Sequence, residues 1–162
     1  MIAQAKPPPN KELKKKLNKA DYIFRGRTNE ILVKRPGDID GIDFCIRDCK
    51  QCDIYLHDRT AQVFVDDITE SIVVIGPDKS SVFVRDCSNC RMIIIAGQLR
   101  VRDCHNIEIM LYSQTDPVIE SSSGMQFWCL QYAYRELSEQ MQAADLSIWN
   151  NKWSDIYDFT PS

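Results

Sequence analysis

The sequence predicts an all-β protein folded as a parallel β-helix, a solenoid in which short strands stack coil upon coil. The first observation behind this prediction is a segment that recurs four times along the chain. Its copies align on Asp48, Asp67, Asp86 and Asp103, which are 19, 19 and 17 residues apart. A period of about 17–19 residues is typical of one coil of a β-solenoid.

The second observation is an alternation of apolar residues within each copy. Positions four and two residues before the aspartate are apolar in every copy, and so are positions one, six and eight residues after it. Spacing by two with many β-branched residues indicates strands, and columns of like residues fill the interior of a solenoid. The predicted interior columns are Phe44, Val63, Val82 and Leu99; Ile46, Val65, Val84 and Val101; Cys49, Ile68, Cys87 and Cys104; Ile54, Val73, Met92 and Ile109; and Leu56, Ile75, Ile94 and Leu111.

The composition is that of one folded domain. The chain has 162 residues, of which 44% are hydrophobic and 27% charged, which is enough for one core but too few for a second full domain. No apolar run reaches the roughly 18 residues of a membrane span, and the first residues lack the apolar stretch of a signal peptide. We therefore expect a soluble, cytoplasmic protein with reduced thiols. A net charge of −3 gives no reason to expect nucleic acid as a partner.

Most of the basic excess lies at the start of the chain, in residues 1–20. Lysines are concentrated there, beside Pro7-Pro8-Pro9. We interpret residues 1–20 as a flexible basic lead-in and residues 21–162 as the folded domain. The alternative is a polybasic segment that helps a membrane anchor to hold anionic lipid. Because Met1 is followed by Ile2 and not by glycine, we expect membrane attachment only through an N-terminal anchor outside this chain.

The seven cysteines raise the question of a metal site. Residues 49–52 and 87–90 both have the CxxC pattern, which in pairs is typical of zinc ligands. In the aligned copies, however, the first cysteine is replaced by Ile68 and the second by Ser71 or Ile107. Isoleucine cannot ligate a metal but can replace a small buried apolar residue. We therefore predict stacked core cysteines and no metal, with zinc as the alternative.

Arg100 departs from the pattern of its copy. An entry segment, residues 21–34, and a turn at residues 36–38 precede the first copy. At the position three residues before the aspartate, the first three copies have Cys45, Phe64 and Phe83, and the fourth has Arg100. Alternation points this column outward, so Arg100 would lie at the end of a row of exposed aromatics. Such a row resembles a recognition surface. The alternative is a surface arginine that only lies over its neighbours.

The end of the chain follows another pattern. A second outward column, Tyr55, Val74, Ile93 and Met110, is apolar in all four copies and needs a cover. Residues 127–141 have apolar residues at helical spacing, so we predict an amphipathic helix that packs on the solenoid and covers one face. Residues 146–161 are rich in aromatics without a clear period, and we interpret them as a strap laid over the scaffold.

Three blocks of the sequence resemble one known family. They are residues 98–104, residues 117–123 and residues 150–161, and together they are similar to the signature blocks of the tubulin-binding cofactor C domain, in particular to the branch of the retinitis pigmentosa 2 protein. The resemblance extends over roughly residues 21–162. It implies a right-handed parallel β-helix, in agreement with the repeat.

The resemblance also implies a function. Members of this family stimulate GTP hydrolysis by a partner with an arginine finger, and the matching residue is Arg100. The partner is an Arf-like small GTPase in its GTP-bound form for one branch and tubulin for the other. No cofactor of the domain itself is implied, since GTP and Mg²⁺ would be carried by the partner. A place at the ciliary base or the membrane periphery is the corresponding expectation for localisation.

Four other residues receive roles from the resemblance or from the strand pattern. Gln98 matches the glutamine of a Gln-x-Arg motif, and we expect it on the opposite side of the strand from Arg100, as local support. Glu120 matches a glutamate that orients the finger through a charge-assisted hydrogen bond, although it is nearly as well explained as a cap for the serines after it. Phe159 matches an apolar contact with the GTPase, with packing on the scaffold as the alternative. Arg102 is expected to be a supporting surface ion-pair residue.

The sequence contains no self-contained active site. His57 and His105 belong to no recognisable triad, and no Gly-rich phosphate loop is present. The expected function is therefore activation of a partner's GTPase by Arg100, with Phe83 and Phe159 in the contact surface. Two alternatives remain open: a non-catalytic effector or adaptor that binds a GTP-bound GTPase, and a tubulin-folding cofactor.

Overall fold

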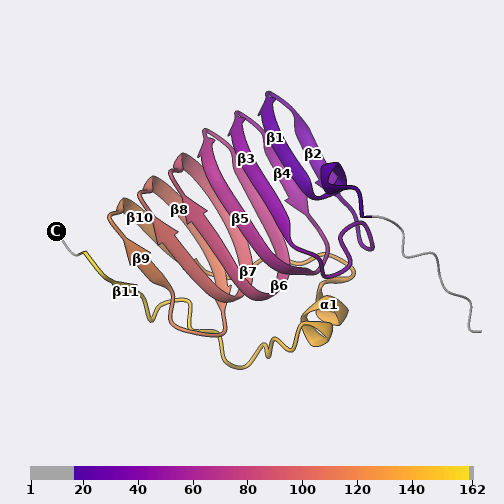
Figure 1. Cartoon of the computed structure of the whole chain (residues 1–162). Helices are drawn as coiled ribbons and strands as arrows, with labels where there is room; N and C mark the ends of the chain where they lie inside the picture. Colours follow the sequence, from indigo (N-terminus) through magenta and orange to yellow (C-terminus); the bar gives the residue numbers. More distant parts are fainter. Residues whose placement is uncertain (1–16, 161–162) are drawn as a thin grey trace, which may run out of the picture.

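The computed structural model describes residues 17–160 and forms a parallel β-helix (Figure 1). The predicted fold class is confirmed, and the predicted domain boundary at residue 20 lies within a short 3-10 helix. The rest of the lead-in, residues 1–16, lies outside the described residues. The elements in order are η1 (Lys19–Tyr22), β1 (Ile23–Thr28), β2 (Ile31–Lys34), β3 (Phe44–Lys50), β4 (Asp53–Leu56), β5 (Thr60–Thr69), β6 (Ile72–Arg85), β7 (Ser88–Arg102), β8 (His105–Ser113), β9 (Val118–Glu120), β10 (Ser123–Cys129), α1 (Leu137–Ala143) and β11 (Tyr157–Asp158).

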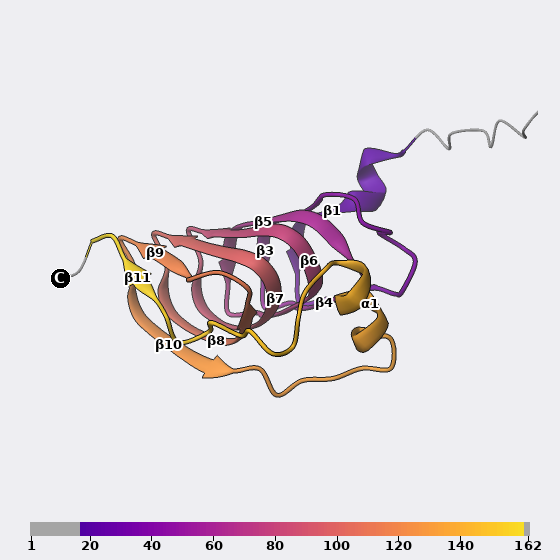
Figure 2. The same ribbon diagram turned by 90° about the horizontal axis from the view of Figure 1, so that it is seen from below.

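The strands form two rows of parallel pairs. On one side β1, β3, β5, the end of β6, the end of β7, β9 and β11 pair in that order. On the other side β2, β4, the start of β6, the start of β7, β8 and β10 pair in that order. The long strands β6 and β7 belong to both rows, since each begins in the second row and ends in the first. The apolar core lies between the two rows (Figure 2).

The aspartate that marks each copy occupies a sharp corner. It has a positive φ, as does the residue three positions later, so every coil turns through two left-handed residues. Asp, Asn and Gly adopt this conformation at low cost, which explains why they dominate the corner. The six pairs are Gly26 and Asn29, Asp48 and Gln51, Asp67 and Glu70, Asp86 and Asn89, Asp103 and Asn106, and Ser121 and Gly124. The solenoid therefore has one more coil at each end than the four that the aspartates indicated.

The interior columns are buried as predicted. Side chains of successive coils stack in register, for example Ile46 on Val65 and Val65 on Val84, and all three are 0% exposed. The stacked cysteines belong to the same core. Burial raises the pKa of Cys90 to about 11, and its thiol donates to the carbonyl oxygen of Ser88 at 3.2 Å. A protonated thiol in an apolar column is a poor metal ligand. Within residues 17–160 no cluster of three His, Cys, Asp or Glu side chains is arranged to hold a metal.

The helix predicted over residues 127–141 is wrong for residues 127–136. Residues 123–129 form β10, which pairs with β8 and adds the last coil. Met125 and Phe127 are half-buried against the core, whereas the neighbouring Gln126 and Trp128 are exposed. This alternation is that of a strand, and the free edge of β8 supplies the backbone partners that decide between the two structures. Only residues 137–143 are helical, and no helix within residues 17–160 is long and apolar enough to cross a membrane.

The second outward column receives its cover from an extended segment. After β10 the chain runs back along the solenoid to α1 (Figure 2). Along the way the Gln131 amide lies 3.2 Å from the Met110 sulfur, and the Tyr132 hydroxyl lies 2.7 Å from Nε2 of His57. Helix α1 then packs Leu137 and Met141 into a second apolar cluster with Ile95 and Tyr112. The column is thus covered only in part and not by the helix, since α1 packs on Ile95 and Tyr112 while Ile93 and Met110 line an open groove beside Trp128.

The strap is confirmed. It leaves α1 and returns toward the last coil, where Trp153 and Ile156 pack against the main core. The side chain of Asn151 replaces strand partners at the edge, since it accepts from the amide of Ser113 and donates to the carbonyl of Leu111, both at 3.0 Å. β11 then pairs with β9 in parallel.

Asp78 is an ionisable side chain buried inside this fold. It lies on β6 with 0% exposure, and its carboxylate accepts from Oγ1 of Thr60 at 2.8 Å and from the amide of Ser80 at 3.0 Å. Burial raises the pKa of Asp78 to about 8 despite these two donors. The folded protein therefore retains a proton that the unfolded chain releases near its ordinary pKa of 3.8.

This difference predicts a pH-dependent stability. Between about pH 5 and pH 8 the free energy of unfolding should fall by up to about 1.4 kcal/mol per pH unit through Asp78, and the loss should end above its folded pKa. Asp78→Asn removes the titration, so denaturant unfolding of this variant should be flatter with pH than that of the wild type. Glu139→Gln, at an exposed position on α1, is the control. Parallel curves for wild type and Asp78→Asn would contradict the prediction.

Candidate functional site

The outward side chains of β1, β3, β5, β6, β7, β9 and β11 form two columns. The first, called the aromatic column here, is the one in which Arg100 replaces the phenylalanine of the preceding coils. It contains Ile23, Cys45, Phe64, Phe83, Arg100, Val118 and Tyr157 in register. The rings of Phe64 and Phe83 stack with centroids 5.2 Å apart and planes 8° apart. Arg100 follows Phe83 directly, as predicted, but it does not end the column, which continues to Val118 and Tyr157, and the rings of Phe64 and Phe83 are half-buried and not exposed.

A charged column lies two residues further along β1, β3, β5, β6, β7 and β9, on the same face as the aromatic column. It contains Arg25, Arg47, Asp66, Arg85, Arg102 and Glu120 in register. Asp66 holds both of its neighbours, since it accepts from Nε of Arg85 at 2.9 Å and from Nη2 of Arg47 at 3.4 Å. This hydrogen bonding contributes to raising the pKa of Arg85, which stays fully charged.

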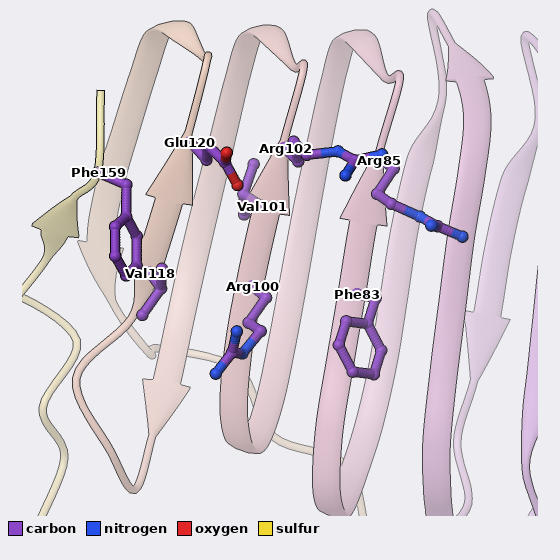
Figure 3. A pocket seen from close by; sticks show the side chains of 8 residues that line it. All are labelled: Phe83, Arg85, Arg100, Val101, Arg102, Val118, Glu120 and Phe159. Atoms are coloured by element: carbon purple, nitrogen blue, oxygen red, sulfur yellow. The ribbon is translucent and has the colours of Figure 1, made fainter. Parts of the chain in front are cut away.

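An open groove of about 390 Å³ lies where the two columns reach the last coils (Figure 3). Five of the six predicted site residues line it together, although they come from β6, β7, β9 and the tail. The lining residues are Phe83, Arg85, Arg100, Val101, Arg102, Val118, Glu120 and Phe159. The groove thus combines three guanidinium groups and one carboxylate with an apolar rim.

Arg100 is exposed and extends from β7 into the groove (Figure 3). Among residues 17–160 its guanidinium has no ion pair and no hydrogen bond, whereas Arg85 is held by Asp66 and Arg102 by Asp103 at 3.4 Å. Five N–H donors in a planar fork are therefore available to a ligand from outside. The expected supporting ion-pair role of Arg102 agrees with its contact to Asp103.

Gln98 does not line the groove. The prediction that it faces away from Arg100 is wrong, because residues two apart in a strand share a face and the buried Leu99 points the other way. Gln98 is half-buried and pairs with Ser81, whose hydroxyl lies 3.5 Å from Oε1 of Gln98. Its contacts are consistent with local support one step behind Arg100.

Glu120 lies in register with Arg102 and not with Arg100. In Figure 3 its carboxylate lies beside Val101 and Arg102, while the guanidinium of Arg100 points away. Among the described side chains no ion pair or hydrogen bond joins Glu120 to Arg100. The backbone carbonyl of Glu120 accepts from the hydroxyl of Ser122 at 2.9 Å. The contact with this serine is therefore made by the main chain of Glu120 and not by its carboxylate.

Phe159 reaches the groove because the tail adds a strand. Pairing of β11 with β9 puts the Phe159 amide 2.9 Å from the carbonyl of Ile119, and its ring faces the groove next to Val118 (Figure 3). The ring is 57% exposed and is supported edge-on by Tyr157 at 4.7 Å. It is therefore a surface aromatic held in place by the fold and not a packed strap residue.

Arg85, Val101 and Val118 also line the groove, although the sequence pattern did not predict them as site residues. Arg85 could have been found from the repeat, because it lies one residue before the aspartate, in the same column as Arg102. Val118 belongs to a coil whose corner has Ser121 in place of aspartate, so no alignment on aspartates could include it.

Comparison with known proteins identifies the family of this chain. A family model described as "Tubulin binding cofactor C" matches residues 41–159, which include Arg100, Glu120 and Phe159. Among curated proteins, Protein XRP2 of Gallus gallus is 44% identical over 90% of this chain and 41% of its own length, and Protein XRP2 of Homo sapiens is 45% identical over 91% and 42%. Tubulin-specific chaperone C of Homo sapiens is 25% identical over 84% of this chain and 39% of its own length.

The chain therefore spans about two fifths of the length of the curated relatives it matches. The part that the family model matches runs from the turn before β3 to the tail that carries Phe159, and so includes all coils of the β-helix except the first. Family match, fold and the resemblance of the three sequence blocks all agree. The chain belongs to the tubulin binding cofactor C family.

Proposed function

We propose that this domain accelerates GTP hydrolysis by an Arf-like small GTPase, with Arg100 as an arginine finger supplied in trans. The observation that carries the proposal is the free guanidinium of Arg100 in an open groove, beside two arginines that already have acidic partners. An arginine that is fixed at its Cα by a rigid strand but unpaired at its tip can enter a partner's active site without breaking an existing contact.

The chemistry of phosphoryl transfer suits this arrangement. Negative charge develops on the transferred phosphoryl group and the leaving oxygen, and a planar guanidinium neutralises it through directional hydrogen bonds. An arginine finger increases the rate by roughly 10³ to 10⁵, which corresponds to about 4–7 kcal/mol of barrier. GTP and Mg²⁺ belong to the partner, so the domain contributes this one group and the surface that positions it.

The rim of the groove supplies apolar contacts around the finger. Phe83 and Val118 are the neighbours of Arg100 in its column, and the exposed ring of Phe159 lies across the groove. Exposed aromatics next to a charged group are typical of the energetic centre of an interface. Glu120 would orient Arg100 only after a side-chain rotation on binding, since the two groups lie apart in the free domain.

The first test is single-turnover GTP hydrolysis by an Arf-like GTPase at saturating domain. Arg100→Ala should lower the stimulated rate by about 10³ or more, and Arg100→Lys should recover little because it keeps the charge but not the fork. Arg91→Ala is the matched control, since Arg91 lies on the same strand on the other side of the solenoid and is exposed. Equal rates for wild type and Arg100→Ala would contradict the proposal.

The second test separates binding from catalysis. Phe159→Ala should weaken binding of the partner, loaded with a non-hydrolysable GTP analogue, by about 10-fold to 100-fold and leave the rate at saturation within a few-fold of wild type. Trp149→Ala removes an 86% exposed aromatic of the same tail outside the groove and should change neither quantity. If Phe159→Ala weakens binding but Arg100→Ala has no effect on hydrolysis, the domain is a non-catalytic effector or adaptor.

Tubulin is the second candidate partner. It is favoured by the family description and by the similarity to Tubulin-specific chaperone C. The relatives at 44–45% identity are named Protein XRP2 and represent the retinitis pigmentosa 2 branch. Because resemblance to that branch implies an Arf-like GTPase, we prefer this partner to tubulin. Capture experiments with purified tubulin and with GTP-loaded Arf-like GTPases distinguish the two, and exclusive retention of tubulin would reject the Arf-like assignment.

A further inference from the structure

The arginines of the charged column continue beyond the groove, along coils that carry no predicted site residue. The two outward columns together hold five arginines, Arg25, Arg47, Arg85, Arg100 and Arg102, against two acidic residues, Asp66 and Glu120. These two columns therefore carry a net charge of +3, within a chain whose net charge is −3. Segregation of this kind favours an oppositely charged partner over a general role in solubility.

The acid in the middle of the column is shielded. The Asp66 side chain is only 13% exposed, whereas Arg47 and Arg85, which clamp it from both sides, are 47% and 40% exposed. The face that meets solvent is therefore formed by guanidinium groups, and Asp66 holds two of them in fixed positions. Fixed arginines lose less conformational entropy when they bind a carboxylate than mobile ones do.

The neighbouring aromatic column favours a protein over a nucleic acid or a membrane. Phe64 and Phe83 stack on one another, so one face of each ring is occupied and cannot stack on a base. Both residues are half-buried, whereas side chains that insert into lipid are exposed on the surface. Glu120, at the end of the charged column, would repel a continuous row of phosphates.

We propose that the partner's footprint extends from the groove along Arg85, Arg47 and Arg25, and that the partner presents an acidic protein surface to this strip. This inference rests on the proposed function for the identity of the partner and goes beyond it by naming a recognition surface outside the groove. Arg100 acts on the reaction, whereas Arg25 and Arg47 steer and align the partner. Rim charges of this kind change the association rate and its salt dependence more than the rate of chemistry.

The test compares two double variants that remove the same charge. Arg25→Gln with Arg47→Gln neutralises the far end of the strip, and Arg35→Gln with Arg91→Gln neutralises two exposed arginines elsewhere. Association of an Arf-like GTPase loaded with a non-hydrolysable GTP analogue should be roughly ten-fold slower for the strip variant at low salt, and the difference should vanish near about 0.5 M salt. Single-turnover hydrolysis at saturation should stay at the wild-type rate.

The outcomes separate this inference from the proposed function. Slower, salt-dependent association of the strip variant supports the acidic partner surface even if Arg100→Ala leaves hydrolysis unchanged and the finger is rejected. Equal association rates for the two double variants overturn the inference. They leave the proposed role of Arg100 as an arginine finger unaffected, because that role is tested separately by Arg100→Ala. Loss of binding to vesicles of anionic lipid by the strip variant, with unchanged GTPase association, also overturns it and assigns the strip to a membrane.

Discussion

In-register stacking of one coil on the next is the constraint on which the rest of this structure depends. Each inward side chain rests on a side chain of the same kind in the neighbouring coil, as in the column of Ile46, Val65 and Val84. The register is fixed because a slip of one residue would turn the whole apolar set outward. The left-handed corners keep it, since each coil turns at the same two positions through residues that tolerate positive φ.

The same register builds the functional face. Outward positions need not match one another to fill a core, so one coil can carry arginine where its neighbours carry phenylalanine. A parallel ladder then places residues of successive coils, 17–22 positions apart in sequence, side by side, and this proximity lets Asp66 clamp the arginines of two coils. The rigid core fixes the backbone of Arg100, while the absence of an acidic partner among the described residues leaves its tip free. A finger that must enter another protein requires both properties.

The repeat predicted the middle of the fold well and its ends poorly. Aspartate marked four coils, but Gly26 and Ser121 take its place in the first and last coils, where the requirement is the backbone conformation and not the side chain. Phe127, Leu130 and Tyr134 have the spacing of a helix stripe, yet the open edge of β8 offered hydrogen-bond partners that a local pattern cannot include. Arg100, Phe83 and Arg102 were placed by alternation, whereas Gln98 was assigned to the wrong side of its strand.

By itself, the sequence determined the fold class, the period, the interior columns and the departure at Arg100. All of these follow from local spacing, because a strand alternates with a period of two and a solenoid repeats its coil. Only the tertiary structure decided that Arg100 has no acidic partner within residues 17–160 and that Glu120 stands beside Arg102 in the free domain. It also decided that the tail brings Phe159 to the groove, through the pairing of β11 with β9 across nearly 40 residues of chain. Those features depend on which chain segments meet in space, and no local pattern of residue types contains that information.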